Sequence, residues 1–230
     1  MLILAIDTTT SVCSVALAND EKLLAEISTD LDRTHSQRLL PMVETLFAET
    51  GRKPEDLDLL AVTRGPGSFT GLRIGIATIK GMGLALDLPV VGVSTLQVLV
   101  HNFGSGLVCP VLNARLNQVY AALYRSGKGS VPECLIPEQA ISVRDLMNKL
   151  ECYEEPIWFC GDGVDLVFPI AAGMLSAPRR APLHLLGNRA AALADLARQH
   201  ESCSADALKP HYLRDSQAEI QLRQRLEGAK

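Results

Sequence analysis

The glycine-rich stretch RGPGSFTGLRIG, residues 64–75, has the residue types and spacing to bind an anion. It lies between an apolar run and a helical pattern, and the free N–H groups at such a helix start can hold a phosphate. A tight turn from a strand into a helix needs glycines for the same backbone freedom. Both interpretations stay open, although the stretch is not a Walker loop because the GK[ST] ending is missing.

Within this loop, Pro66 stiffens the turn, and Ser68 or Thr70 can cap the helix that follows. The residues that we single out in the motif are Arg64, Gly65, Pro66, Gly67, Ser68, Phe69, Thr70, Gly71 and Arg73.

A second candidate is Asp7, which ends the first apolar run and precedes Thr8. In two-lobed ATPases an acid at this place faces Mg²⁺ and phosphate, so Asp7 and Thr8 could form a vestigial phosphate loop. An Asp after a strand is more often a turn or cap residue. Asp162, between two glycines in the second half, could form a counterpart of this loop. It could also be an ordinary turn residue.

The histidines and cysteines do not indicate a metal centre or a nucleophile. The five histidines include no HExxH or other close ligand pair. His35, in THSQRLLP (34–41), is expected to make a polar contact beside a helix start. No GxSxG is present. The six cysteines form no CxxC pair, which is typical of reduced cysteines in a cytosolic protein.

Composition indicates a globular protein with a core of its own. Of the 230 residues, 47% are hydrophobic and 21% are charged, which excludes a disordered, collagen-like or coiled-coil chain. The net charge of −4 lacks the basic surplus of a free-standing nucleic-acid binder. An RNA-related role would therefore need a local patch or a basic partner. No run of about 18 apolar residues occurs, so no transmembrane helix is expected.

Hydrophobic periodicity predicts the elements that position these residues. Strands are expected at 2–6, 12–17, 23–28, 57–62, 89–93, 107–113, 118–124, 131–136 and 157–160. Helices are expected at 36–50 and 68–86, after the caps Ser94 and Ser142, from Asn188 to about His200, and from Gln217 to Leu226. The order of strands and helices occurs twice, which predicts an α/β protein with two mixed-sheet lobes, the second reduced.

The lobe boundary is placed at GSG, residues 104–106. The predicted domains are an N-terminal, partner-binding lobe at 1–104, a reduced C-terminal lobe at 105–216, and a C-terminal helix or tail at 217–230.

The helix predicted at 68–86 has little side-chain bulk. Ala77, Gly81 and Ala85 are spaced by four and share one face. Glycine inside a helix costs about 1 kcal/mol relative to alanine, so the interior glycines imply a compensating use. Close packing on the helix's own sheet and contact with a helix of another protein both remain open.

Six motifs in order carry a resemblance to a known family. They are ILAIDTTTSVCSVAL at the start, THSQRLLP (34–41), RGPGSFTGLRIG (64–75), GVSTL (92–96), NARLNQVYAALY (113–124) and PHYLR (210–214). Together they resemble the bacterial TsaB (YeaZ) family of tRNA threonylcarbamoyladenosine biosynthesis proteins, over nearly the whole chain.

The resemblance implies the two-lobed fold of the actin/Hsp70/sugar-kinase ATPases. It also implies a non-catalytic partner and activator of TsaD, the enzyme that threonylcarbamoylates the adenosine beside the anticodon in tRNAs reading ANN codons. TsaE joins this pair, and ATP is used by the complex while no cofactor is bound tightly by this chain. A homodimer alone, indirect contact with tRNA, a cytoplasmic location and no membrane contact are further expectations.

The resemblance places the partner contacts on the helices at 36–50 and 71–86. The candidate interface residues are Leu39, Val43, Leu46, Phe47, Leu72, Gly75, Ile76, Ile79, Gly81 and Gly83. No catalytic or metal-binding residue is expected. The sequence departs from the family at Asn113 and at Asn117-Gln118, where an acid and Gly-Glu are common. The first alternative is an ATP-dependent kinase or ATPase of the same fold. The least favoured alternative is a metallopeptidase, because the sequence lacks a set of metal ligands.

Overall fold

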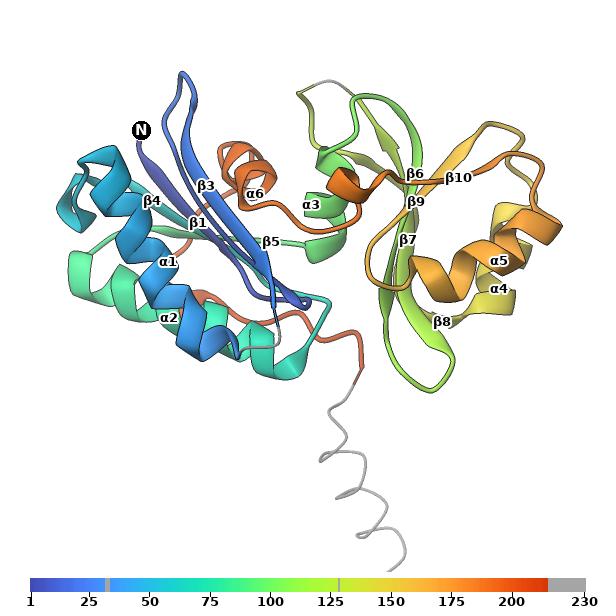
Figure 1. The fold of residues 1–230 in the computed structure, drawn as a ribbon, viewed down its shortest axis with the longest axis horizontal. Helices are drawn as coiled ribbons and strands as arrows, with labels where there is room; N and C mark the ends of the chain where they lie inside the picture. Colours follow the sequence, from blue (N-terminus) through green and yellow to red (C-terminus); the bar gives the residue numbers. More distant parts are fainter. Residues whose placement is uncertain (32–33, 128, 215–230) are drawn as a thin grey trace, which may run out of the picture.

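Two five-stranded mixed sheets lie side by side in the structure, a computed structural model that describes residues 1–31, 34–127 and 129–214 (Figure 1). The N-terminal sheet has the order β3-β2-β1-β4-β5, with β1 (Ile3–Asp7), β2 (Val12–Ala18), β3 (Leu23–Asp30), β4 (Leu59–Thr63) and β5 (Val90–Val93). The C-terminal sheet has the order β10-β9-β6-β7-β8, with β6 (Gly106–Asn113), β7 (Gln118–Ser126), β8 (Glu133–Ser142), β9 (Ile157–Cys160) and β10 (Pro178–Arg180).

The second sheet repeats the topology of the first. In each, three antiparallel strands are followed by two strands that run parallel to the first strand and extend the sheet from its side. The helices are α1 (His35–Thr50), α2 (Phe69–Leu86), α3 (Thr95–His101), α4 (Val143–Leu150), α5 (Val164–Met174) and α6 (Ala190–Ala197). The predicted duplication and the actin/Hsp70/sugar-kinase type of fold are therefore confirmed.

Helices α1 and α2 lie together on one face of the N-terminal sheet (Figure 1). Their apolar stripes pack on the residues of β1, β2 and β4 that point to that face, such as Leu4 and Val62. Helix α1 ends at Gly51, which has the left-handed φ of 64° that favours glycine at a helix end. Helix α2 is long and apolar enough to cross a membrane, but its buried residues belong to this core.

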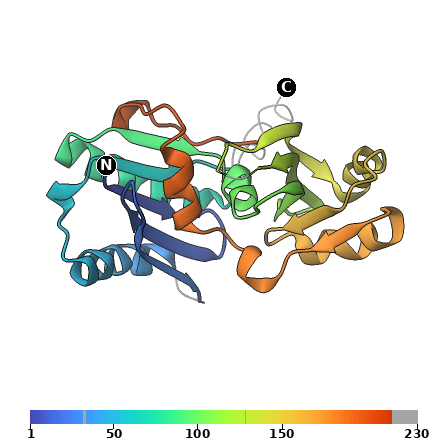
Figure 2. The same cartoon turned by 90° about the horizontal axis from the view of Figure 1, so that it is seen from above.

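Two helices between the sheets pack on the sheet of the lobe other than the one expected from their place in the sequence. Helix α3 packs on the C-terminal sheet, where Leu96 and Leu99 meet Val108 and Tyr124. Helix α6 returns to the N-terminal sheet and lies across its strands (Figure 2). The boundaries at 104 and 216 stay predictions. In the structure, Leu96, Leu99 and Phe103 pack in the C-terminal core while Val98 packs in the N-terminal one, and the buried apolar residues of 190–208 pack in the N-terminal core.

Other sequence predictions hold with shifted ends. Ser94 and Ser142 accept hydrogen bonds at the starts of α3 and α4, as expected. Helix α5 and strand β10 were not predicted. The sequence VDLVFPIAAGM of α5 is apolar on most positions and contains Pro169, so it lacks a clear helical period. The predicted helix from Gln217 to Leu226 and the tail 217–230 lie outside the described residues.

Candidate partner-binding face and interlobe junction

The glycine-rich stretch forms the turn from β4 into α2, and it packs against the turn between β1 and β2. The N–H of Ser68 donates to the carbonyl oxygen of Thr9 at 2.8 Å. The hydroxyl of Ser68 accepts the N–H of Gly71 at 3.3 Å and caps α2. A Cβ on Gly71 would overlap the carbonyl oxygen of Thr8. These contacts favour the turn interpretation over an anion loop.

The other motif residues surround this turn. A Cβ on Gly67 would overlap the carbonyl oxygen of Thr9, and Pro66 is buried. Thr70 and Arg73 are exposed on the first turns of α2, and Arg64 is exposed before it.

A C-terminal segment, residues 209–214, crosses this turn, and we call it the strap. The N–H of His211 donates to the carbonyl oxygen of Arg64 at 2.6 Å, and a Cβ on Gly65 would overlap the carbonyl oxygen of His211. The ring of Tyr212 stacks on Phe69 with centroids 4.7 Å apart. The strap therefore holds the start of α2 in place.

Asp7 is fully buried, and both of its carboxylate oxygens accept hydrogen bonds from the chain itself. The backbone N–H and hydroxyl of Thr9 donate to one oxygen at 2.8 and 2.7 Å, and the amide of Asn188 donates to the other at 2.6 Å. Burial raises the pKa of Asp7, while these hydrogen bonds oppose the rise. The Thr8 hydroxyl donates to the carbonyl oxygen of Gly71 at 2.7 Å. Asp7 and Thr8 thus tie segments together in this structure.

The glycines of α2 divide into two kinds. A Cβ on Gly75 would lie 2.5 Å from the hydroxyl oxygen of Thr8, and one on Gly83 would lie 3.0 Å from a methyl of Val90. Their small size is explained by packing within the chain. Gly81 is exposed, and a Cβ added there would meet nothing within 4 Å. Only Gly81 among these three lacks a use inside the chain.

The candidate interface drawn from the sequence is corrected by this packing. Phe47 is partly buried, and Gly81 is exposed. The other residues are buried in the chain's own core or against its own backbone, namely Leu39, Val43, Leu46, Leu72, Gly75, Ile76, Ile79 and Gly83. The apolar stripe of an amphipathic helix is the part that its own sheet covers, so it could not also be the contact surface.

The solvent side of α1 and α2 carries two exposed leucines. Leu40 of α1 is 53% exposed and Leu84 of α2 is 61% exposed. Ala77, Gly81 and Ala85 are also exposed and form the small-residue stripe expected from the sequence. We call these five residues the outer helical face. It combines exposed leucines with a line along which another helix can approach closely.

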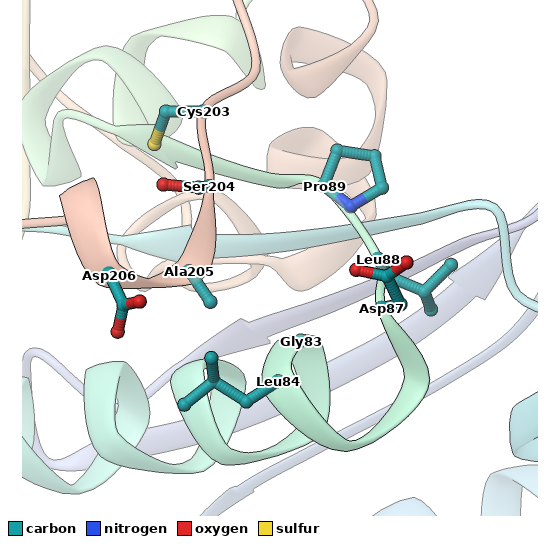
Figure 3. A pocket seen from close by; sticks show the side chains of 9 residues that line it. All are labelled: Gly83, Leu84, Asp87, Leu88, Pro89, Cys203, Ser204, Ala205 and Asp206. Carbon is teal, nitrogen blue, oxygen red and sulfur yellow. The ribbon is translucent and has the colours of Figure 1, made fainter.

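A pocket of about 340 Å³ lies at the C-terminal end of α2 (Figure 3). It is bordered by Leu84 and Asp87 on the helix and by Cys203 and Asp206 on the segment that returns to the N-terminal lobe. Leu84 belongs to both the pocket and the outer helical face. The pocket therefore continues that face past the end of α2.

The junction between the lobes contains a polar cluster that the sequence did not reveal. Glu138 of β8 accepts hydrogen bonds from the hydroxyls of Ser94, before α3, and of Tyr124 on β7, the latter at 2.6 Å. Its second oxygen lies 4.0 Å from the ring of His211. Burial raises the pKa of Tyr124, and the nearby carboxylate adds to the rise. No spacing in the sequence links these residues, which only the fold brings together.

The remaining sequence candidates have structural partners. His35 contacts the carbonyl oxygen of Thr10 at 2.8 Å and the guanidinium of Arg38 at 3.2 Å, so the expected polar contact is confirmed. The carboxylate of Asp162 accepts the N–H of Asn113 at 2.8 Å in the turn before α5. All six cysteines are free. Within the described ranges, no group of three His, Cys, Asp or Glu side chains is arranged to hold a metal ion.

Comparison with known proteins places most of the chain in one family. Residues 22–222 match the family model described as "TsaD: tRNA N6-adenosine threonylcarbamoyltransferase". The tRNA threonylcarbamoyladenosine biosynthesis protein TsaB of Bacillus subtilis is 34% identical over 95% of this chain and 96% of its own length. The Escherichia coli protein of the same name is 42% identical over 57% of this chain and 58% of its own. The solved structure of YeaZ from Pseudomonas aeruginosa has a TM-score of 0.77 at 30% identity, covering 92% of this chain and 99% of that one.

Proposed function

The chain belongs to the TsaB family, and from this premise we propose that it takes part in tRNA threonylcarbamoyladenosine biosynthesis as a non-catalytic partner of TsaD. In this proposal the chain pairs with TsaD through the outer helical face, and TsaE is recruited to the pair. ATP is used by the complex, and this chain binds no cofactor tightly. The assembly works in the cytoplasm and involves no membrane.

The observation that carries the proposal is the exposed Gly81 in the middle of α2. Its cost to the helix is about 1 kcal/mol relative to alanine, and no contact inside the chain requires it. A helix packed against α2 at this point would meet no Cβ, so the two axes could approach closely. Covering Leu40 and Leu84 would add about 1 to 2 kcal/mol each, because both are more than half exposed.

Pairing would activate TsaD by differential binding. A partner that contacts one conformation of TsaD better than another shifts its population toward that conformation. The same outer helical face is free to pack on a second copy of this chain when TsaD is absent, which gives the homodimer.

The buried state of Asp7 supports a non-catalytic role. To reach a nucleotide phosphate, this carboxylate would have to leave the donors Thr9 and Asn188. The kinase or ATPase alternative gains no support from the described residues, since the β1–β2 turn is packed under the start of α2.

The test is the affinity of the full chain for the TsaD of the same genome, with Gly81→Leu and a matched control. Gly173→Leu in α5 is the control, because Gly173 is also an exposed helical glycine with nothing within 4 Å of an added Cβ. We expect Gly81→Leu to weaken binding at least about tenfold, or about 1.4 kcal/mol. Gly173→Leu should change the dissociation constant less than about twofold.

Stability separates this effect from misfolding. Both substitutions replace a helical glycine and should raise the melting temperature slightly. Equal affinities of Gly81→Leu and the unchanged chain for TsaD would refute the proposed interface.

A further inference from the structure

The strap and the two turns that it touches form a surface with basic groups and few free acids. Residues 64–80, 107–126 and 207–214 each contain Arg or Lys and no Asp or Glu, although the chain as a whole has a net charge of −4. The fold brings these three segments together at one edge of the lobe junction. Figure 1 shows the strap, the start of α2 and the β6–β7 turn along the lower side of the molecule.

Contacts of the strap join the three segments directly. His211 bonds to the carbonyl oxygen of Arg64 in the first segment. The guanidinium of Arg214 donates to the carbonyl oxygen of Ala114 at 3.0 Å in the second. This surface carries the cations Arg64, Arg115, Lys209 and Arg214 together with the imidazole of His211, and we call these five residues the basic strap face.

Among the residues of this face, His211 lies 4.0 Å from the carboxylate of Glu138. Within the described residues, Arg64, Arg115, Lys209 and Arg214 form no ion pair with a carboxylate. Two carboxylates nearby, those of Glu138 and Asp162, accept hydrogen bonds from other groups of the chain.

The β6–β7 turn holds Arg115 in a strained backbone. Arg115, Leu116 and Asn117 have φ of 61°, 51° and 57°, a conformation that costs free energy in residues other than glycine. The N–H of Arg115 donates to the side-chain oxygen of Asn113 at 2.8 Å. Arg115 and Leu116 are exposed in this turn.

We propose that the basic strap face binds the phosphate backbone of RNA. Guanidinium and ammonium groups recognise phosphates and release counterions when they do so. The choice of RNA among polyanions rests on the proposed function. This chain then contacts tRNA directly within the complex, beyond the indirect contact expected from the sequence.

The experiment measures the affinity of the full chain for fluorescently labelled tRNA, alone and bound to TsaD, between about 50 and 200 mM KCl. The variant is Arg115→Gln/Lys209→Gln, and the control is Arg52→Gln/Arg144→Gln. All four residues are exposed and form no ion pair in the described part of the chain, and both double variants change the net charge equally. We expect the first double variant to lose about tenfold or more in tRNA affinity and about 2 units of salt slope. The control should change the affinity less than about twofold.

Three results would overturn the proposal. The first is an equal loss in both double variants, which would reflect net charge alone. The second is tRNA binding that does not depend on this chain, either alone or in the complex. The third concerns competition for bound tRNA, measured without a cationic protein partner. If polyglutamate displaces tRNA as well as poly(U) of the same charge does, or if polyglutamate alone displaces it, the face does not select RNA. Displacement by polyglutamate alone would indicate that its ligand is an acidic protein. Affinity for TsaD is measured on the same samples, so failure of the partner proposal is seen separately.

Discussion

Residues 8–10, after the first strand of the N-terminal lobe, are buried under the start of α2, whereas residues 115–117, after the first strand of the C-terminal lobe, are open to solvent. The two lobes share one strand order, and each has glycines that allow close packing beside its first strand. In the N-terminal lobe Gly71 admits the β1–β2 turn. In the C-terminal lobe Gly161 packs against Val111 and Leu112 at the end of β6, and the β6–β7 turn is not part of this contact.

The two turns therefore differ in what they expose. The closed turn keeps Asp7 away from solvent and fixes α2, so the solvent side of that helix is available for a partner. The open turn presents Arg115 beside the strap. We expect the largest effects from substitutions in the glycine packing on which both lobes depend.

Gly71→Ala should produce the largest loss of stability, about 3 kcal/mol. The added methyl group would overlap the carbonyl oxygen of Thr8 and separate α2 from the β1–β2 turn. Gly161→Ala should cost about as much, because its methyl would overlap the carbonyl oxygen of Val111 and its φ is 101°. Denaturant unfolding measures both variants. Gly81→Ala is the control and should be neutral or stabilising, and a loss as large as that of Gly71→Ala would contradict the account.

Asn188→Ala should cost about 2 to 3 kcal/mol of stability. The change removes the amide that donates to the buried carboxylate of Asp7 at 2.6 Å and to the hydroxyl of Thr9 at 3.1 Å. Asn102→Ala is the comparison, since the Asn102 amide donates only to carbonyls of its own helix. If both variants unfolded at the same denaturant concentration, the hydrogen bond from Asn188 to Asp7 would not stabilise the β1–β2 turn.

Asp7→Asn should flatten the dependence of stability on pH. Burial raises the pKa of Asp7 in the folded chain, so its contribution is present at low pH and is lost as pH rises from the unfolded pKa, about 3.9, through the folded one. The loss can reach about 1.4 kcal/mol per pH unit in that window. Unfolding at several pH values measures it. A variant that becomes steadily less stable than the unchanged chain as pH rises would reverse the expected sign.

Tyr212→Ala should have the smallest effect, about 1 kcal/mol. It removes the stacked pair with Phe69 that fastens the strap to the start of α2. Tyr212→Phe keeps the ring and should keep the stability. Melting temperatures distinguish the two variants, and a similar decrease in both would mean that the hydroxyl rather than the stack matters.

The positions of most strands and most helix ends could be predicted because they depend on local patterns. Gly51 ends α1, and Ser94 starts α3, by their own backbone and side-chain chemistry. Which sheet α3 and α6 pack on could not be predicted, because both helices are apolar and their own residues do not identify the sheet that covers them. Helix α5 was missed because its apolar residues lack a period.

The exposure of the candidate interface residues could be predicted only in part. The spacing of Ala77, Gly81 and Ala85 indicated a small-residue stripe, and the structure exposes it. The same sequence suggested Leu39 and Ile79 as contacts, although a buried stripe and a binding stripe look alike in a helix. The tie between Asp7 and Asn188 joins residues far apart in the chain and leaves no pattern.

Hydrogen exchange of this chain, free and bound to the TsaD of the same genome, tests pairing through the outer helical face. We expect TsaD to slow exchange of amides in α1 and α2, while those of α5, the corresponding helix of the other lobe, stay unchanged. Slower exchange in α5 with α1 and α2 unaffected would contradict the proposed pairing, because the partner would then bind the wrong lobe.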